Sequence, residues 1–376
     1  MKNLLFIMHA LNGGGAEKVL IEILRHINYK QYNVELLLNY TDGIHFKEVP
    51  SNVKIISIYG DYTIKYRILD KLSSVSRWIN CFRQFYLKKK LFSILDEKYD
   101  SIISFMEGDA LKNHSYITNK SHNNITWLHT DLPKNHWTLL RTFHNSKEEK
   151  SCYEKMNKIV FVSNEIKNTF QDLYKLNRKG IVIYNPINTE EIIKKADLSE
   201  IKKECFTIIS IGRLTQIKRY DRLIKAIQLL KAENYKIKVW ILGEGEEEKS
   251  LKELSTKLKV DDTIYFKGYK ENPYPYIKAA DLLVSTSDAE SFSLVIAEAL
   301  CLGKIIISTK TAGALELLEN KYGILVEMNE QSLYIALKKI LDNKKLQEKY
   351  KSLSLERARN LSDIKSTMEQ LYSLFN

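Results

Sequence analysis

The feature that most constrains this chain is an alternation of short apolar runs with helical patterns, which restarts near the middle of the sequence. Such alternation is typical of parallel sheets, in which each strand is followed by a crossover helix. The expected strands before the restart are Leu4–Met8, Val34–Leu38, Val53–Ile58, Ser101–Phe105, Ile125–Leu128, Ile159–Val162 and Gly180–Ile183. Those after it are Thr207–Ile211, Lys238–Leu242, Thr263–Lys267, Leu282–Ser285, Lys304–Ser308 and Gly323–Val326. The pattern predicts an α/β protein with two parallel sheets.

The restart also predicts where the domains divide. A chain of 376 residues exceeds the usual domain size of about 100–200 residues. We expect one domain at 1–186, a second at 187–360, and a helix at 361–376 that packs back toward the first. Ligands of open parallel sheets bind beyond the carboxyl ends of the strands, so two such domains facing across a cleft would present two ligand shelves. The expected helices are Ala16–Ile27, Glu165–Leu173, Arg222–Lys231, Leu251–Leu258 and Ser293–Leu302, and the tail from about Leu346 to Phe375 is also expected to be helical.

The formal net charge of +12 is concentrated in the segment 64–92. This segment has one acid, Asp70, and the basic residues Lys65, Arg67, Lys71, Arg77, Arg83, Lys88, Lys89 and Lys90. Its aromatic residues are Tyr66, Trp78, Phe82, Phe85, Tyr86 and Phe92. Basic residues among aromatics suit an anionic membrane surface or a nucleic acid, and they also suit a solvated helix with an aromatic core face. Because no nucleic-acid motif accompanies the segment, we expect membrane contact and no nucleic-acid partner.

Other broad classes are excluded by what the sequence lacks. No apolar stretch approaches the ~18 residues that a spanning helix needs. The four cysteines are too far apart for zinc-ligand or redox spacing, and the first apolar run ends in glycines without a cleavage site. We therefore expect a cytoplasmic protein, peripheral on the inner face of the cell membrane, without a metal ion or resident cofactor.

The strongest chemical signal is a pair of acids around a predicted helix start. Glu290 precedes the helix and Glu298 lies inside it, with Ser293 as the expected N-cap and Gly303 closing the far end. The backbone amides of Ser291, Phe292, Ser293 and Leu294 lie between the two acids. A helix start favours anions, so a diphosphate can dock there while each carboxylate accepts hydrogen bonds from sugar or ribose hydroxyls. A buried Glu298 would be costly without a partner, which favours a functional role.

Two further signals suit a diphosphate. Arg213 and Lys218 follow a predicted strand end at Gly212 and flank the approach to a helix, where they can neutralise a leaving group. The glycines at 13–15 follow the first strand, and their amides can approach an oxyanion. Taken alone, the first pair is ordinary surface charge and the second is a tight strand–helix turn. Their positions beside the paired acids make the anion-binding interpretation stronger.

These motifs resemble the GT4 family of retaining glycosyltransferases, which have the GT-B fold of two Rossmann-like domains. Glu290 and Glu298 have the family's E-x7-E spacing. The other matching motifs are Gly-Arg-Leu…Lys at 212–218, Gly-Gly-Ala-Glu at 14–17, Leu-Gly-Glu-Gly at 242–245, Phe-Lys-Gly-Tyr at 266–269 and Gly-Ala-Leu-Glu at 313–316. They run through nearly the whole chain in the family's order. The chain looks like the capsule, O-antigen and lipid-linked-oligosaccharide enzymes of bacteria.

The resemblance implies a role for each matched residue. Glu290 would contact the donor sugar and Glu298 the nucleotide ribose. Arg213 and Lys218 would hold the diphosphate, with Gly14 and Gly15 approaching it from the first domain. Gly243 and Tyr269 would lie by the nucleotide, and His129, in Trp-Leu-His-Thr-Asp, would face the donor sugar. The resemblance also implies retention of configuration and no metal ion.

The predicted function is transfer of a hexose or N-acetylhexosamine from a nucleotide sugar, with UDP favoured, to a saccharide acceptor. We favour an acceptor linked to polyprenyl diphosphate, in cell-surface polysaccharide synthesis. Two alternatives share the architecture: a sugar-nucleotide 2-epimerase and a non-catalytic partner subunit of a transferase. The paired acids fit transfer better than epimerisation, and intact Glu290, Arg213 and Lys218 argue against a non-catalytic subunit.

Overall fold

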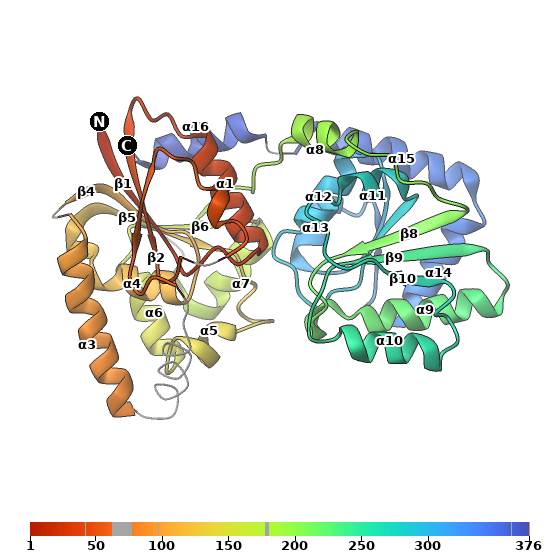
Figure 1. The fold of residues 1–376 in the computed structure, drawn as a ribbon, viewed down its shortest axis with the longest axis horizontal. Helices are drawn as coiled ribbons and strands as arrows, with labels where there is room; N and C mark the ends of the chain where they lie inside the picture. Colours follow the sequence, from red (N-terminus) through yellow and green to blue (C-terminus); the bar gives the residue numbers. More distant parts are fainter. Residues whose placement is uncertain (42, 62–76, 97, 177–179, 362, 376) are drawn as a thin grey trace. The chain divides into compact units, whose positions relative to one another are not determined.

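The computed structural model describes residues 1–41, 43–61, 77–96, 98–176, 180–361 and 363–375. These residues form two compact units (Figure 1). Unit 1 comprises Met1–Pro186 and Ile364–Asn376, and unit 2 comprises Ile187–Asp363.

Unit 1 is built, over its described residues, on a seven-stranded parallel sheet of order β3-β2-β1-β4-β5-β6-β7. The strands are β1 Lys2–Met8, β2 Tyr32–Leu38, β3 Val53–Ser57, β4 Tyr99–Ser104, β5 Ser121–Leu128, β6 Lys158–Phe161 and β7 Gly180–Val182. The helices are α1 Gly15–His26, α3 Arg77–Ile94, α4 Asp109–Tyr116, α5 Trp137–Arg141, α6 Ser146–Glu154, α7 Asn164–Tyr174 and α16 Ile364–Phe375. The described residues of the unit also form two short 3-10 turns, η1 Phe46–Glu48 and η2 Thr118–Lys120.

The centre of this sheet is apolar on both faces. Every residue of β1 from Leu4 to Met8 is fully buried, as expected for a parallel strand covered by helices on two sides. β1 pairs with β2 on one side and with β4 on the other. The chain therefore reverses its direction of winding between β1 and β4, and this switch point is where parallel sheets usually bind ligands.

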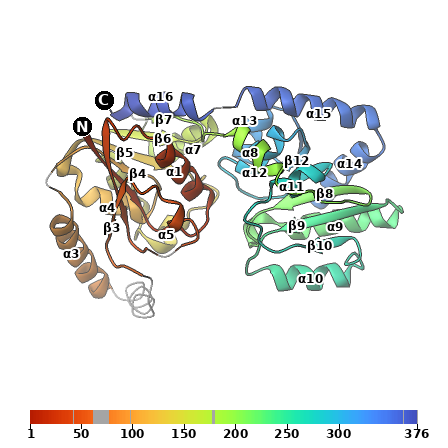
Figure 2. The ribbon, with the colours of Figure 1, turned by 45° about the horizontal axis from the view of Figure 1, so that its top comes forward.

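The helix α16 packs on unit 1 although it follows unit 2 in the sequence (Figure 2). The Tyr372 ring stacks on Tyr32 at a centroid distance of 5.4 Å, and Phe375 meets Phe6 edge-on at 6.2 Å. The Tyr372 hydroxyl also accepts a hydrogen bond from the Asn28 amide at 2.9 Å. Apolar burial and this bond hold the helix against β1, β2 and the end of α1.

Unit 2 repeats the design with a six-stranded parallel sheet, over its described residues, of order β10-β9-β8-β11-β12-β13. The strands are β8 Phe206–Ile211, β9 Ile237–Leu242, β10 Ile264–Phe266, β11 Leu282–Ser285, β12 Ile305–Thr309 and β13 Ile324–Val326. The helices are α8 Thr189–Ala196, α9 Tyr220–Ala232, α10 Glu248–Lys257, α11 Tyr274–Ala279, α12 Leu294–Cys301, α13 Ala312–Leu318, α14 Glu330–Leu341 and α15 Lys344–Arg359, with the 3-10 turn η4 Gln216–Lys218. The switch point lies between β8 and β11.

Alternation along the strands of unit 2 produces two hydrophobic cores. Ile208 packs with α9, α10 and α14, whereas its neighbour Ile209 packs with α8, α11, α12 and α13. Ile305 and Ile307 likewise face the first core, and Ile306 faces the second. Successive side chains of a strand point to opposite faces, so an unbroken apolar run serves both layers.

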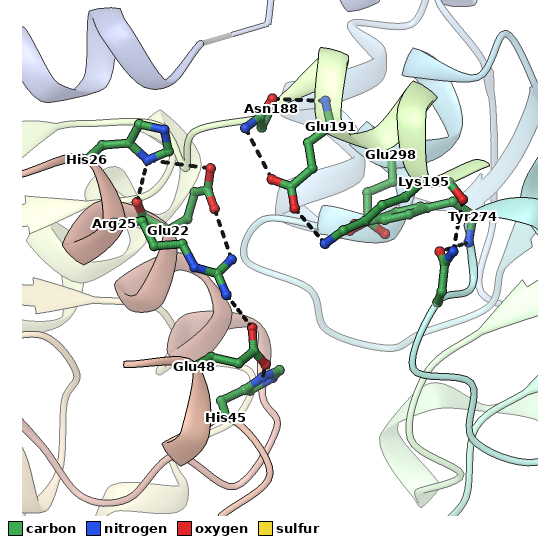
Figure 3. Close-up of polar contacts among 11 residues, drawn as sticks. Glu22, Arg25, His26, His45, Glu48, Asn188, Glu191, Lys195, Tyr274 and Glu298 are labelled. Carbon is green, nitrogen blue, oxygen red and sulfur yellow. Dashed lines mark hydrogen bonds and ion pairs between the residues drawn. The ribbon is translucent and has the colours of Figure 1, made fainter. Parts of the chain in front are cut away.

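The prediction of two parallel-sheet α/β domains is confirmed, and each expected strand and helix is present with small shifts at its ends. The predictions missed α4, α5, α6, α8, α11, α13 and α14, whereas a helix such as α3 was one of the interpretations of segment 64–92. The charged stretch after Pro186 begins with α8, which Asn188 caps by accepting a hydrogen bond from the Glu191 amide at 3.1 Å (Figure 3). None of the described helices combines the length and hydropathy needed to cross a bilayer.

Candidate active site

The switch point of unit 2 brings together the two motifs that carry the predicted chemistry. The loop after β8 contains Lys218, and the loop after β11 contains Glu290. The Lys218 ammonium pairs with Glu290 Oε1, which also accepts a hydrogen bond from the Ser287 hydroxyl at 2.9 Å. Both charged side chains are partly buried, so each can still reach a ligand at the carboxyl edge of the sheet.

A second ion-pair network holds these loops in place. Arg222 is 3% exposed, and its guanidinium donates to the Thr286 carbonyl at 2.6 Å and to Asp288 at 2.9 Å. Arg219 also donates to Asp288, at 3.1 Å, and adopts the left-handed conformation with φ of 51°. The Asp288 amide in turn donates to the Ile217 carbonyl at 2.9 Å. Thus the segment before Glu290 and the segment before α9 are fastened to each other.

The helix α12 begins beside this pair. Its N-cap is Ser293, whose hydroxyl accepts from the Ile296 amide, and Gly303 follows its end with φ of +62°, as predicted. The Ser293 carbonyl accepts from the Ala297 amide, so within the described chain the amides of Leu294 and Val295 remain directed outward from the helix start. The sequence thus places the positive end of α12 at the edge of the sheet.

Glu298 lies inside α12 and is 6% exposed. Its Oε1 accepts a hydrogen bond from the Tyr274 hydroxyl of α11 at 3.1 Å (Figure 3). This buried acid therefore has a partner within the protein, which reduces the cost of burying a carboxylate. Glu298 is an acceptor with a fixed position.

Glycines let the neighbouring loops approach the same edge. A Cβ on Gly243, which has φ of +133°, would lie 2.0 Å from the Gly212 carbonyl oxygen, so the ends of β8 and β9 can meet only because Gly243 lacks a side chain. The Gly243 amide donates to the Gly268 carbonyl at 2.9 Å, which joins the end of β9 to that of β10. Tyr269 follows and is 51% exposed. The Arg213 side chain is also exposed.

A Cβ on Gly313, at the start of α13, would come within 2.9 Å of the backbone nitrogens of Phe292 and Ser293. This glycine therefore allows close packing against the segment between Glu290 and α12. Its own amide donates to the Glu290 carbonyl at 2.7 Å. The Gly-Ala-Leu-Glu motif consequently helps to shape the loop that carries the first acid of the pair.

Unit 1 has polar groups at its own switch point. Gly14 is the N-cap of α1 and Gly15 is its first residue, directly after the loop that follows β1. His9 follows β1 directly, and its Nδ1 lies 3.0 Å from Asp109 Oδ2 at the start of α4. Both side chains are partly exposed, at 44% and 35%, so this pair is open to a ligand of unit 1.

His129 follows β5 and has a ring enclosed by aromatics. Its ring centroid lies 5.1 Å from that of Phe105 and 6.4 Å from that of Trp127. Burial lowers the pKa of His129 to about 3, so the imidazole is neutral at physiological pH. Its backbone amide donates to the buried Glu107 carboxylate at 3.0 Å.

Across the described ranges, no group of three or more histidine, cysteine, aspartate or glutamate side chains could hold a metal ion. In unit 2, the cationic side chains that the sequence predicted for an anion are Arg213 and Lys218, both of which lie in the chain after β8.

Two family profiles match nearly the whole chain. The profile of Glycosyltransferase Family 4 matches residues 13–191, and that of Glycosyl transferases group 1 matches residues 188–355. The chain belongs to the group 1, family 4 glycosyltransferases.

Two relatives of this chain, both from bacteria, are named as glycosyltransferases. It is 33% identical over 197 residues to the N-acetylgalactosamine-N,N'-diacetylbacillosaminyl-diphospho-undecaprenol 4-alpha-N-acetylgalactosaminyltransferase of Campylobacter jejuni, covering 52% of this chain and 53% of that one. An uncharacterized glycosyltransferase of Haemophilus influenzae is 25% identical over 327 residues, covering 86% and 85%. The match to the Campylobacter protein thus spans about half of its length.

The fold of the glycosyltransferase is GT-B, as predicted. The crystal structure of Anabaena Alr3699/HepE in complex with UDP and glucose superposes with a TM-score of 0.73 over 99% of both chains, at 19% identity. Both family and fold agree with the resemblance seen in the sequence.

Within unit 2, the structure gathers the predicted residues of this glycosyltransferase at one sheet edge. Lys218, Gly243, Tyr269 and Glu290 follow the neighbouring strands β8, β9, β10 and β11, and α12 starts beside them. Gly14, Gly15 and His129 lie in unit 1.

Sequence reasoning missed several polar residues of this glycosyltransferase: Glu107, Asp109, His9, Asp288 and Arg222. Each lies just beyond a strand end or packs against such a loop, and that position was the available signal.

Proposed function

We propose that the protein transfers a hexose or N-acetylhexosamine from a UDP-sugar to a saccharide acceptor carried on polyprenyl diphosphate. Unit 2 binds the donor and unit 1 binds the acceptor. The reaction proceeds with retention of configuration and without a metal ion. The observation that carries this proposal is the Lys218–Glu290 pair beside the start of α12 at the switch point of unit 2.

Each part of the donor has a chemical partner at this edge. The diphosphate takes Arg213, Lys218 and the outward amides of α12, because cations and a helix start both favour an anion. Glu290 accepts hydrogen bonds from the sugar hydroxyls, and Glu298 accepts them from the ribose. The exposed Tyr269 lies by the base.

The chemistry requires stabilisation of a leaving diphosphate. The bond between the anomeric carbon and the phosphate oxygen breaks, the acceptor oxygen bonds to the same face of that carbon, and the departing phosphate takes the acceptor's proton. The products are a glycoside and UDP, so no protein nucleophile is needed. Negative charge grows on the phosphate in the transition state, and Lys218 and Arg213 stabilise it there.

The names of similar proteins support the two substrates. The Campylobacter relative is named as a transferase acting on a diphospho-undecaprenol-linked sugar, and the Anabaena structure contains UDP and glucose. We extend both classes to this protein as part of the proposal.

A lipid-linked acceptor requires access to a membrane surface, which we assign to segment 64–92. Residues 62–76 and the side chains of 77–83 lie outside the described part. On the described turns of α3, Phe85 is 71% and Phe92 39% exposed, and Lys88 and Lys89 share their face. Leu91 is fully buried and anchors the opposite face. Two exposed aromatics with two lysines suit an anionic interface, which supports the proposed location on the inner face of the cell membrane.

Release of UDP tests the main proposal. Purified protein is incubated with a panel of nucleotide sugars, with and without lipid-linked saccharides. UDP should form only when donor and acceptor are both present, the product should keep the donor's anomeric configuration by NMR, and excess EDTA should leave the rate unchanged. If the sugar of the nucleotide sugar is instead epimerised when no acceptor is present, the protein is an epimerase. Turnover lost with chelator and restored by Mn²⁺ or Mg²⁺ would overturn metal independence.

Vesicle co-sedimentation tests the membrane assignment. Reversing the charge of Lys88 and Lys89 should abolish binding to anionic vesicles and leave UDP binding intact. The matched control reverses Lys344 and Lys345, an exposed pair on α15 of unit 2, and should bind vesicles normally. Equal binding of the first variant, or equal binding of the wild type to neutral vesicles, would mean that α3 presents only a solvated face.

A further inference from the structure

Glu107 is a carboxylate buried at the carboxyl edge of unit 1. It is 1% exposed and follows β4 by three residues. Burial raises its pKa, which four hydrogen bonds to the carboxylate oppose, so the position is costly for a charge and needs a reason. The proposed chemistry above makes no use of it.

Three of the donors to Glu107 come from the chain after β5. The His129 amide donates to Oε2 at 3.0 Å, the Thr130 hydroxyl bonds Oε1, and the Trp137 indole donates to Oε1 at 3.3 Å. The next residue, Gly108, has φ of +74°, and a Cβ there would lie 2.6 Å from the Trp137 ring. Glu107 and Gly108 thus pack against the loop after β5 and against the first turn of α5.

The loop that Glu107 holds carries the His129 ring, which has one nitrogen without a hydrogen-bond partner among the described residues. His129 Nε2 is buried and has no hydrogen-bond partner among the described residues. The His129 ring contacts Phe105 and Trp127, and the backbone amide of the same residue is bound by the Glu107 carboxylate. A buried polar atom without a partner is unfavourable unless a ligand supplies one.

We propose that Glu107 is a positioning residue: its buried carboxylate fixes the backbone at His129 and Thr130 so that the His129 ring is held for a sugar hydroxyl. The sugar contact rests on the proposed function, whereas the positioning does not. A group held in advance loses less freedom when a ligand arrives, and small displacements of such a group reduce the rate strongly.

The test follows the His129 ring itself in protein labelled on its histidines, with the signal assigned by a His129→Gln variant. In the wild type this signal should not titrate between pH 5 and 8, because burial keeps the imidazole neutral. Glu107→Ala should release the loop, admit water to the ring and move its titration into that range. Glu107→Gln should shift it less, since an amide can accept from the His129 amide and donate to the Thr130 hydroxyl. Thr130→Val, which removes one bond, should also give a small shift.

Glu149→Ala is the matched control. Glu149 is also fully buried in unit 1 and accepts from Thr138, Tyr174 and His136 at 2.8–2.9 Å. Its loss should lower Tm comparably and leave the His129 signal unchanged. In assays of transfer, Glu107→Ala should lower kcat/KM by about 10²-fold, with UDP binding unchanged.

An unchanged His129 titration in the Glu107 variants would overturn the proposal. If the alanine variant does not fold, the His129 titration is measured in Glu107→Gln and Thr130→Val instead. An unchanged titration in both variants overturns the proposal. If the signal moves but no sugar is transferred by the wild type, the positioning stands and the proposed function fails.

Discussion

Units 1 and 2 apply the same sheet design to different chemistry. In unit 2 the switch point is bridged by Lys218 and Glu290, and in unit 1 by His9 and Asp109. All eight histidines of the chain lie between residues 9 and 144, hence in unit 1. A lysine ammonium beside a carboxylate suits an anionic ligand, whereas imidazole nitrogens, which can donate or accept hydrogen bonds, suit hydroxyl groups. This difference agrees with the proposal that unit 2 binds the donor through its diphosphate and that unit 1 binds the saccharide acceptor.

The largest expected effect tests the charged pair of unit 2. Lys218→Ala should lower kcat by roughly 10²–10³-fold and weaken donor binding much less, because charge on the leaving phosphate grows in the transition state. Steady-state kinetics together with UDP titration separates the two terms. Lys225→Ala is the control: Lys225 is on the adjacent helix and pairs with Asp221. Near-native kcat in Lys218→Ala would remove the basis for assigning the donor to unit 2.

Acid should weaken unit 1 before unit 2. Burial lowers the pKa of His114 to about 4, from about 6.5 in an unfolded chain. The folded state therefore binds fewer protons than the unfolded state, and stability falls as pH drops below 6.5. Between pH 6.5 and 5 the loss is about 2 kcal/mol, at ~1.4 kcal/mol per unit.

Hydrogen exchange resolved by peptide checks this pH dependence. Amides of unit 1 should lose protection at pH 5 while those of unit 2, which has no histidine, keep theirs. His114→Gln should remove about half of the dependence, because the buried His129, whose pKa is lowered to about 3, contributes a similar loss. Equal loss in both units would mean that carboxylates, and not histidines, set the acid sensitivity.

A smaller effect is expected at Glu298, the carboxylate that we propose binds the nucleotide ribose. Glu298→Ala should raise the donor KM roughly tenfold with little change in kcat, because a ribose contact is alike in ground and transition states. Tyr274→Phe removes the hydrogen bond to Glu298 and should raise KM only a few fold. A fall in kcat without a rise in KM would show that Glu298 acts on the reacting sugar.

The smallest expected effect is a loss of stability at two helix caps, which tests whether the two units unfold independently. Asn145 caps α6 in unit 1, and Asn329 caps α14 in unit 2, each accepting from an amide three residues on at 3.0 and 2.8 Å. Alanine at either position should cost about 1 kcal/mol. If the units are independent, urea unfolding followed by exchange should show each variant shifting only its own unit. A shared shift would mean one cooperative transition.

The sequence was sufficient for the sheets because strands buried on both faces are nearly continuous apolar runs. It was insufficient for α4, whose residues 112–115 are polar yet buried. Lys112 pairs with Glu148 at 3.0 Å and donates to the Thr142 carbonyl at 2.8 Å, so partners from later segments compensate the burial. Hydropathy reports none of these partners.

In the candidate site, too, some features could be predicted from the sequence and others could not. Glu290 and Glu298 could be related by helix geometry because one short segment contains both. Pairing Glu290 with Lys218 requires knowing that β8 lies beside β11, and the strand order follows only from the folded sheet. Glu107 is 22 residues from its partner His129, and no local pattern marks either as connected to the other.

The placement of α16 has a consequence for synthesis on the ribosome. Unit 1 comprises residues from both ends of the sequence, so its aromatic contacts between Tyr32 and Tyr372 cannot form until unit 2 has been translated. Unit 2 is continuous and can fold as soon as it emerges, although it is made second. Until then the surface around Phe6 that Phe375 covers stays exposed on the nascent chain. A chaperone that binds apolar surface would therefore find its target on the half that is made first.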